Sequence, residues 1–394
     1  MKKTVLTSII LGLFLCSLLP AQNSTAKEEY IKAMTASDVN QRASLLKEWV
    51  SQYGGTGQEN ENFAYATLCI LPYEGKSPSE TIKYGEKALE LGGLDDQSKC
   101  QVLIHLASIM TSQGQNLNKA ASYGAQVVQV AESAKNNAPD SNSANAWDQM
   151  IGAGYYTQAQ AMEKAGNFKG AIDNYISSFN ILKNKQIISK LAALGKKLYD
   201  KKQYSDAAKA FKTANEVMNT FATTSFYAKS LHRSGNKDQA LKYYKQAFSK
   251  QKSGEVAYNI GLIQAANAKQ DPSVTDEAVE YLLYASFLSK ANSEKAMKLA
   301  EGLYFSTKSS YNEKVKELAA KAEELETLTD NFNEKFGEKN EEDLTDEEKE
   351  EVKEMRKQIK SLQETVNQLQ EEQKQELEKF KALIEEIKNK LGIG

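Results

Sequence analysis

The stretch GNFKGAIDNY, residues 166–175, decides the fold because later parts of the chain repeat its pattern. KQYSDAAKAF covers residues 202–211 and GNKDQALKYY covers residues 235–244, and a looser fourth copy surrounds Ala278. The anchoring alanines, Ala171, Ala207, Ala240 and Ala278, lie 36, 33 and 38 residues apart. A period in this range is typical of helix pairs that stack on their neighbours, because one pair alone cannot bury its apolar face. The pattern therefore predicts an all-α stack of repeats.

These copies resemble the tetratricopeptide repeat, a helix-turn-helix unit of about 34 residues. The resemblance covers residues 147–290 well and residues 25–133 loosely. It implies an all-α fold, a tetratricopeptide-type α-solenoid whose helix pairs form a right-handed superhelix. In that family, small residues stand where the two helices of a unit cross closely. By position, the resemblance gives this packing role to Ala159, Ala171, Gly195, Ala207, Ala228, Ala240, Gly261 and Ala278.

The resemblance also implies a binding surface, because tetratricopeptide arrays usually hold a peptide or partner segment along the concave face of their first helices. Carried over by position, that groove would present Tyr156, Gln160, Lys196, Tyr199, Lys229, His232, Arg233 and Tyr258. Aromatic and cationic side chains together favour a partner that is extended, partly acidic and partly apolar. Taken singly, the same residues also fit an ordinary solvated surface.

Residues 1–21 have the pattern of a secretory signal peptide, since two lysines precede an apolar stretch from Val5 to Leu19. Small residues place the cleavage after Ala21 or after Ala26, and the sequence does not choose between them. No later apolar run reaches about eighteen residues, so no membrane-spanning helix is expected after removal of the signal. We therefore expect an exported bacterial protein, periplasmic or extracellular.

A segment that breaks the helical pattern divides the predicted repeats into two groups. Divergent helical repeats are expected over residues 25–135, and the clearer tetratricopeptide repeats over residues 147–306. Between them, residues 136–146 contain Pro139 and many Asn and Ser residues, which predicts a loop.

The composition changes beyond Tyr311, where Glu and Lys dominate and apolar residues narrow to a stripe. This pattern predicts a coiled coil over residues 311–391, with helices at about 311–336 and 346–391. Gln373 and Glu376 interrupt the apolar seam of the second helix, as a tolerated defect or as a change of packing partner. Two arrangements stay open at this point: an intermolecular dimer that makes a homo-oligomer, or an intramolecular hairpin.

Composition argues against several kinds of chemistry. The formal net charge is −2 and the pI about 6.0, so we expect no nucleic-acid partner. The only histidines, His105 and His232, are far apart, and His105 is interpreted as structural. We expect no catalytic residue, no metal site and no cofactor, and hence no enzyme. Cys69 and Cys100 are interpreted as buried apolar residues, although an exported protein could bridge them.

Three functions compete at this stage. The first is an exported, non-enzymatic scaffold or adaptor that binds a protein or peptide partner along the concave face of its repeats. The second is a structural envelope oligomer or tether driven by the coiled coil, whose 46-residue helix would be a rod of about 70 Å. The third is binding of a cell-wall polymer through tyrosines. The residues do not identify the partner.

Overall fold

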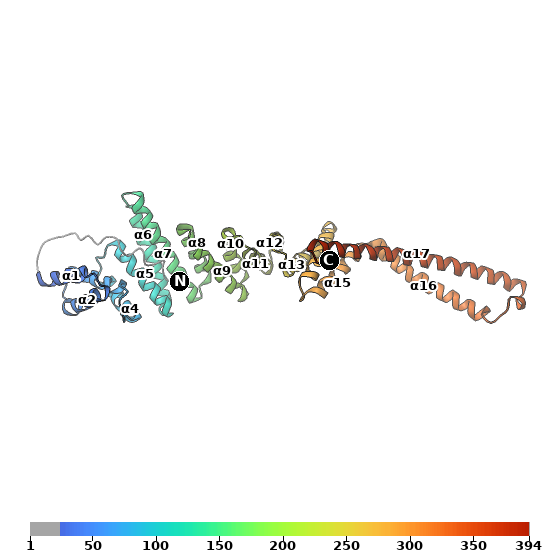
Figure 1. The fold of residues 1–394 in the computed structure, drawn as a ribbon, viewed down its shortest axis with the longest axis horizontal. Helices are drawn as coiled ribbons and strands as arrows, with labels where there is room; N and C mark the ends of the chain where they lie inside the picture. Colours follow the sequence, from blue (N-terminus) through green and yellow to red (C-terminus); the bar gives the residue numbers. More distant parts are fainter. Residues whose placement is uncertain (1–23, 394) are drawn as a thin grey trace. The chain divides into compact units, whose positions relative to one another are not determined.

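The computed structural model describes residues 24–393, and the predicted signal peptide lies outside this range. The described residues form 17 α-helices and two short 3-10 helices, with no β-strand (Figure 1). The fold is therefore all-α, as predicted. The chain divides into two compact units, with the boundary between Ile188 and Ser189. None of the helices in residues 24–393 is long and apolar enough to cross a membrane.

Unit 1 is a succession of helices in which each packs on the next. Its helices are α1 Ser24–Thr35, α2 Val39–Tyr53, α3 Glu61–Ile70, α4 Pro78–Leu91, α5 Asp96–Gln113, α6 Leu117–Asn136, α7 Ser141–Ala165 and α8 Phe168–Leu182. Helix α9, Lys185–Asp200, runs across the boundary into unit 2. A first apolar core joins α1 to α3, around Leu46, Trp49 and Leu68. A second core, around Leu103 and Leu106, joins the helices from α3 to α7.

The predicted loop over residues 136–146 is wrong in extent. Helix α6 continues to Asn136 and α7 begins at Ser141, so only residues 137–140 are non-helical. The physical reason is a cap: the carboxylate of Asp140 accepts a hydrogen bond of 2.8 Å from the backbone N–H of Ser143. Such a bond satisfies a donor in the first turn, and it lets the polar residues after Asp140 start a helix.

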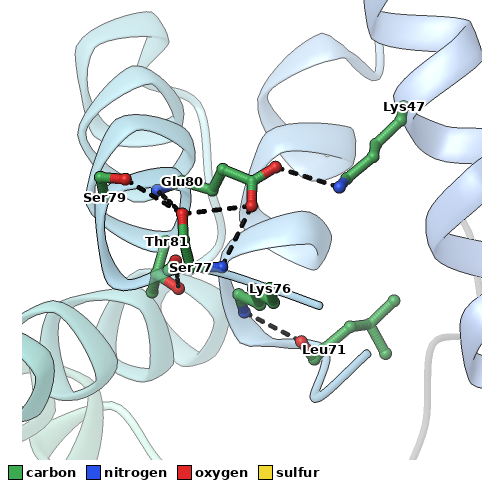
Figure 2. Close-up of polar contacts among 7 residues, drawn as sticks. All are labelled: Lys47, Leu71, Lys76, Ser77, Ser79, Glu80 and Thr81. Atoms are coloured by element: carbon green, nitrogen blue, oxygen red, sulfur yellow. Dashed lines mark hydrogen bonds and ion pairs between the residues drawn. The ribbon is translucent and has the colours of Figure 1, made fainter. Parts of the chain in front are cut away.

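The junction of α3 and α4 shows how polar side chains fix the helix ends of unit 1 (Figure 2). The Lys76 ammonium donates a hydrogen bond of 2.9 Å to the carbonyl oxygen of Leu71, at the end of α3. Ser77 and Glu80 form a reciprocal capping box at the start of α4. Glu80 also pairs with Lys47 of α2 at 3.0 Å. Three consecutive helices are thus linked through one turn.

Both cysteines of the described chain are free and fully buried, Cys69 in α3 and Cys100 in α5. Burial raises the pKa of each thiol to about 12, so both stay protonated near neutral pH. In the structure they are small apolar core residues and form no bridge.

His105 of α5 should make unit 1 sensitive to acid. Burial, and then the nearby Lys76 ammonium, lower the pKa of His105 from 6.5 to about 4. The unfolded chain therefore takes up a proton first, and stability is lost as the pH falls below 6.5 towards 4. We expect wild type to lose about 1 to 2 kcal/mol more than His105→Gln between pH 7 and pH 5. Urea unfolding at both pH values measures this difference, and equal losses would contradict the assignment.

Unit 2 continues the helix pairs and ends in a long hairpin. Its further elements are α10 Tyr204–Met218, α11 Phe221–Arg233, α12 Lys237–Lys250, α13 Gly254–Asn267, η1 Pro272–Val274, α14 Thr275–Leu288, α15 Ser293–Ser306, α16 Ser309–Phe336, η2 Glu341–Asp343 and α17 Asp346–Leu391. From α10 to α15, consecutive α-helices pack on one another. Unit 2 therefore has the sequential packing of a repeat array.

The small residues of the repeats lie where neighbouring helices pack closely. All eight residues to which the resemblance gives a packing role are buried, including Ala207, Ala240 and Ala278 at 0% exposure. A Cβ atom added at Gly195 would lie 3.1 Å from the Phe211 ring. One added at Gly261 would lie only 2.7 Å from Cγ of Leu282. At Gly261 the helices are thus too close for a larger side chain, whereas at Gly195 the Phe211 ring would have to move by a few tenths of an ångström.

Helices α16 and α17 pack against each other antiparallel within one chain. Three ion pairs define their register: Lys314 with Glu372 at 2.5 Å, Lys335 with Glu351, and Lys339 with Glu348 at 2.7 Å. As the residue number rises along α16, the partner's number falls along α17. The sequence left open an intermolecular dimer or an intramolecular hairpin, and the structure has the hairpin.

The far end of α17 packs on the last repeat helices instead of on α16. The ring of Phe380 lies 4.9 Å from Tyr304 of α15, and Lys390 pairs with Glu280 of α14 at 3.1 Å. Between these contacts, Ile387 is fully buried. The polar interruption at residues 373–376 falls between the last ion pair to α16 and the first ring contact to α15. It therefore marks a change of packing partner.

Candidate partner-binding surface

The eight predicted groove residues lie on the first helices of the repeats. Tyr156 and Gln160 lie on α7 in unit 1, and the other six lie on α9, α11 and α13 in unit 2. The six are Lys196, Tyr199, Lys229, His232, Arg233 and Tyr258. Each unit therefore carries its own part of the predicted surface.

On α7, the two predicted residues touch each other. The Gln160 amide donates a hydrogen bond of 3.3 Å to the Tyr156 hydroxyl. The Tyr156 ring meets the buried Tyr175 of α8 edge-on, with centroids 5.8 Å apart, and the Tyr175 hydroxyl donates to Glu163 at 3.0 Å. Tyr156 is half-buried. This patch is held in place by its own contacts, which reduces the entropy that binding would cost.

In unit 2, aromatic rings join α9 to α11. The half-buried ring of Tyr199 lies 5.3 Å from Tyr204 and 5.8 Å from Phe226, edge-on to both. Phe226 in turn stacks on the buried Phe211 at 5.2 Å, with an interplanar angle of 10°. Edge-on and offset-stacked pairs are favourable arrangements for aromatic rings. Tyr199 is therefore a rigid, half-buried anchor.

The two predicted lysines differ in their ion-pair partners and in the exposure of their side chains. The Lys229 ammonium pairs with Glu255 of α13 at 2.8 Å and lies 5.3 Å above the Phe226 ring, and its side chain is only 16% exposed. Lys196 pairs with Asp200 on its own helix at 2.7 Å, and its side chain is 58% exposed. Lys229 thus links two first helices, whereas Lys196 extends towards solvent.

The remaining three residues lie near the C-terminal part of α11 and on α13. The His232 ring packs edge-on against the buried Tyr244 at 5.9 Å. Burial, followed by the charges of Arg233 and Lys237, lowers the pKa of His232, so this ring is neutral near pH 7. Arg233 is exposed and no carboxylate of residues 24–393 lies within ion-pair distance of it. Tyr258 is half-buried on α13.

Sequence reasoning missed two residues of this surface, Phe226 and Glu255. Phe226 precedes Lys229 by three residues and Glu255 precedes Tyr258 by three, so each shares a helix face with a predicted residue. This spacing of three residues is the sequence signal that could have identified Phe226 and Glu255 as members of the surface. Their roles come from contacts across helices, which a position-by-position comparison does not describe.

No group of three or more His, Cys, Asp or Glu side chains within residues 24–393 is arranged to hold a metal ion. A cavity of about 310 Å³ lies beside α6 and α7 in unit 1, and no titratable side chain lines it. Its lining residues are Asn118, Ala121, Ser122, Gln158, Met162, Ala165 and Asn167.

Comparison with known proteins finds similarity only among solved structures. No protein-family model matches the chain, and no curated protein matches it. A tetratricopeptide repeat protein from Parabacteroides merdae matches over 71% of this chain and 100% of its own, at 13% identity and a TM-score of 0.34. The TPR2AB domain of yeast Sti1, in a complex with pHSP90, matches over 71% and 98%, at 15% identity and a TM-score of 0.24. Yeast Tom70 matches over 73% and 66%, at 13% identity and a TM-score of 0.27.

Proposed function

We propose that this protein is an exported, non-enzymatic scaffold that binds a protein or peptide partner along the first helices of its repeats. The observation that carries the proposal is the continuous contact from Tyr199 through Phe226 and Lys229 to Glu255, which spans α9, α11 and α13. Rigid aromatic anchors beside charged groups are the side chains that dominate binding energy at protein interfaces.

The chemistry of this surface favours an extended partner with apolar and acidic side chains. Tyr199 of α9 and Tyr258 of α13 offer half-buried rings, and Lys196 of α9 and Arg233 of α11 offer exposed cations. A segment lying across several first helices could insert an apolar side chain against the rings and place a carboxylate near the cations. The partner itself is not identified by these residues.

The alternative, an envelope oligomer or tether driven by the coiled coil, has less support. Its apolar seam is already occupied within the chain, since Val352, Val366 and Leu369 are all less than 9% exposed in a single copy. Binding of a cell-wall polymer is a third candidate, and no observation favours it over a protein partner.

The test is capture of partners from bacterial envelope extracts after photo-crosslinking, with Tyr156, Lys196 and Tyr199 changed to Ala. We expect the groove variant to lose the crosslinked partners of wild type, because truncation of anchor residues typically costs more than 1 kcal/mol each. A matched control changes Glu216 of α10 and Gln246 of α12 to Ala, both exposed on second helices. Identical partners for wild type and the groove variant would refute the proposed surface.

A further inference from the structure

Two cations on one face of α11 differ in whether the chain itself supplies their counter-ion. Lys229 and Arg233 lie four residues apart, so their side chains are neighbours on one side of the helix. Lys229 pairs with Glu255 of α13, whereas no carboxylate of residues 24–393 lies within ion-pair distance of Arg233. One cation of the proposed surface is thus paired within the chain, and the other is open.

The contact between Lys229 and Glu255 uses both oxygens of the carboxylate. The Lys229 Nζ atom lies 2.8 Å from Oε1 and 2.8 Å from Oε2 of Glu255. The same ammonium lies 5.3 Å from the centroid of the Phe226 ring, which is within the range of a cation–π contact. The position beside Lys229 therefore fits a carboxylate, and the Phe226 ring helps to hold the cation that receives it.

The two partners of this ion pair differ in exposure. The Lys229 side chain is 16% exposed, and the Glu255 side chain is 59% exposed. The cation is thus held between Phe226 and Glu255, while the Glu255 side chain reaches it from the solvent side. The Glu255 carboxylate can rotate away into water at small cost, because exposed ion pairs add little to stability.

Packing, rather than this ion pair, holds α11 and α13 in place. Both helices pack on α12, which lies between them in the chain. Their apolar faces are buried, at Leu231 of α11 and at Ile260 of α13. Since the fold has these contacts, displacement of Glu255 from Lys229 leaves the array intact.

We propose that Glu255 occupies the place of a partner's carboxylate on Lys229, so that an acidic segment binds by exchanging its own carboxylate for that of Glu255. This inference rests on the proposed function, because it concerns the same surface. The Cβ atoms of Lys229 and Arg233 are about 5 to 6 Å apart, so a segment with two neighbouring acidic side chains reaches both cations. A neutral segment leaves the pair of Lys229 and Glu255 in place.

Fluorescence anisotropy with the full-length chain tests the exchange. The acidic probe is a fluorescein-labelled synthetic peptide of Glu, Tyr, Gly and Ser, and the neutral probe has Gln at every Glu position. We expect Glu255→Gln to bind the acidic probe about two- to fivefold more tightly than wild type, because Lys229 is then free. Its affinity for the neutral probe should equal that of wild type. Equal affinity of the two proteins for the acidic probe, or no binding of it by Glu255→Gln, would overturn the inference.

The salt dependence of the same affinity gives a second measurement. In wild type, the acidic probe gains a contact with Lys229 only as Glu255 loses one, so the number of ion pairs at Lys229 stays constant. In Glu255→Gln a new ion pair forms, and salt weakens such a pair by screening. Between about 0.01 M and about 1 M salt, the affinity of Glu255→Gln should therefore fall more steeply than that of wild type. Equal slopes would contradict the exchange.

Two further variants assign the gain in affinity to Lys229. Lys229→Met keeps an unbranched side chain beside Phe226 without the charge, and combined with Glu255→Gln it should bind the acidic probe no more tightly than wild type. Tighter binding by this double variant would mean that the gain does not come from Lys229. The matched control is Glu86→Gln, which removes a carboxylate from an ion pair between α4 and α6 of unit 1, with Lys119 at 2.5 Å, and should leave the affinity unchanged.

The outcomes separate this inference from the proposed function. If the variant with Tyr156, Lys196 and Tyr199 changed to Ala binds the acidic probe at wild-type strength, the proposed surface itself is wrong. If that variant loses binding while Glu255→Gln matches wild type, the surface stands and only the exchange at Lys229 is wrong. Misfolding cannot produce the expected result, since a misfolded Glu255→Gln protein would bind more weakly and not more tightly.

Discussion

Changing Ile387 to Asp is expected to release the C-terminal end of α17 from α14 and α15 and to lower the stability of unit 2 by about 3 to 5 kcal/mol. Ile387 has 0% exposure, between the ring contact of Phe380 and the ion pair of Lys390. A carboxylate there would lose its hydration without gaining a partner. The end of a repeat array must be covered, so release would also expose the rings of α14 and α15.

Urea unfolding followed by circular dichroism gives the loss of stability, and limited trypsin digestion locates it. Cleavage after Lys379 and Lys381 should become faster, whereas α10 to α13 should stay protected. The matched control is Ile393→Asp, because Ile393 lies beyond α17 and is 50% exposed, so its stability should change by less than about 0.5 kcal/mol. Unfolding of Ile387→Asp at the wild-type urea concentration would mean that α17 does not cover the last repeat.

Gly261→Leu is expected to destabilise the pair of α13 and α14 by about 3 kcal/mol. A Cβ atom at position 261 would already lie 2.7 Å from Cγ of Leu282 and 3.2 Å from its backbone nitrogen, so the remaining atoms of leucine have no space. The two helices must separate, which costs packing energy along their contact. This loss exceeds the gain of less than 1 kcal/mol that leucine offers over glycine in a helix.

The same substitution at Gly302 is expected to have the opposite effect and to raise stability. Gly302 lies inside α15, is exposed, and no heavy atom lies within 4 Å of a Cβ built on it. Only helix propensity then changes, so stability should rise by up to about 1 kcal/mol. Urea unfolding of both variants measures the contrast in sign. If Gly261→Leu were as stable as wild type, close approach at that position would not be needed for the fold.

Much of the helical framework could be predicted because its signals are local. The bounds of α17, residues 346–391, follow from the capping box of Thr345 and Glu348 and from Gly392, whose φ of 68° ends the helix in the left-handed region. The start of α7 was missed, although Asp140 is a local signal of the same kind. The richness in Asn and Ser after it favoured a loop, and the cap outweighed that composition.

The candidate surface was less predictable, because its properties depend on neighbouring helices. Position along the repeat indicated Tyr199 and Lys229, but not that Lys229 pairs with Glu255, 26 residues further along the chain. Nor did it indicate that His232 packs on Tyr244 and is neutral near pH 7. Both contacts depend on the distances between helices, and the period of the repeat does not specify those distances.

By itself, the sequence determined that this protein is a succession of helix pairs, since the small residues recur at fixed spacing and local caps such as Asp140 and Thr345 begin several of the helices. Only the tertiary structure decided what the long C-terminal helix contacts. A heptad stripe specifies an apolar face but not the surface that covers it, and the same stripe fits a second copy, α16 or a repeat. The chain folds α17 back along α16 and then onto α14 and α15, because these helices offer apolar surface within reach of its own length.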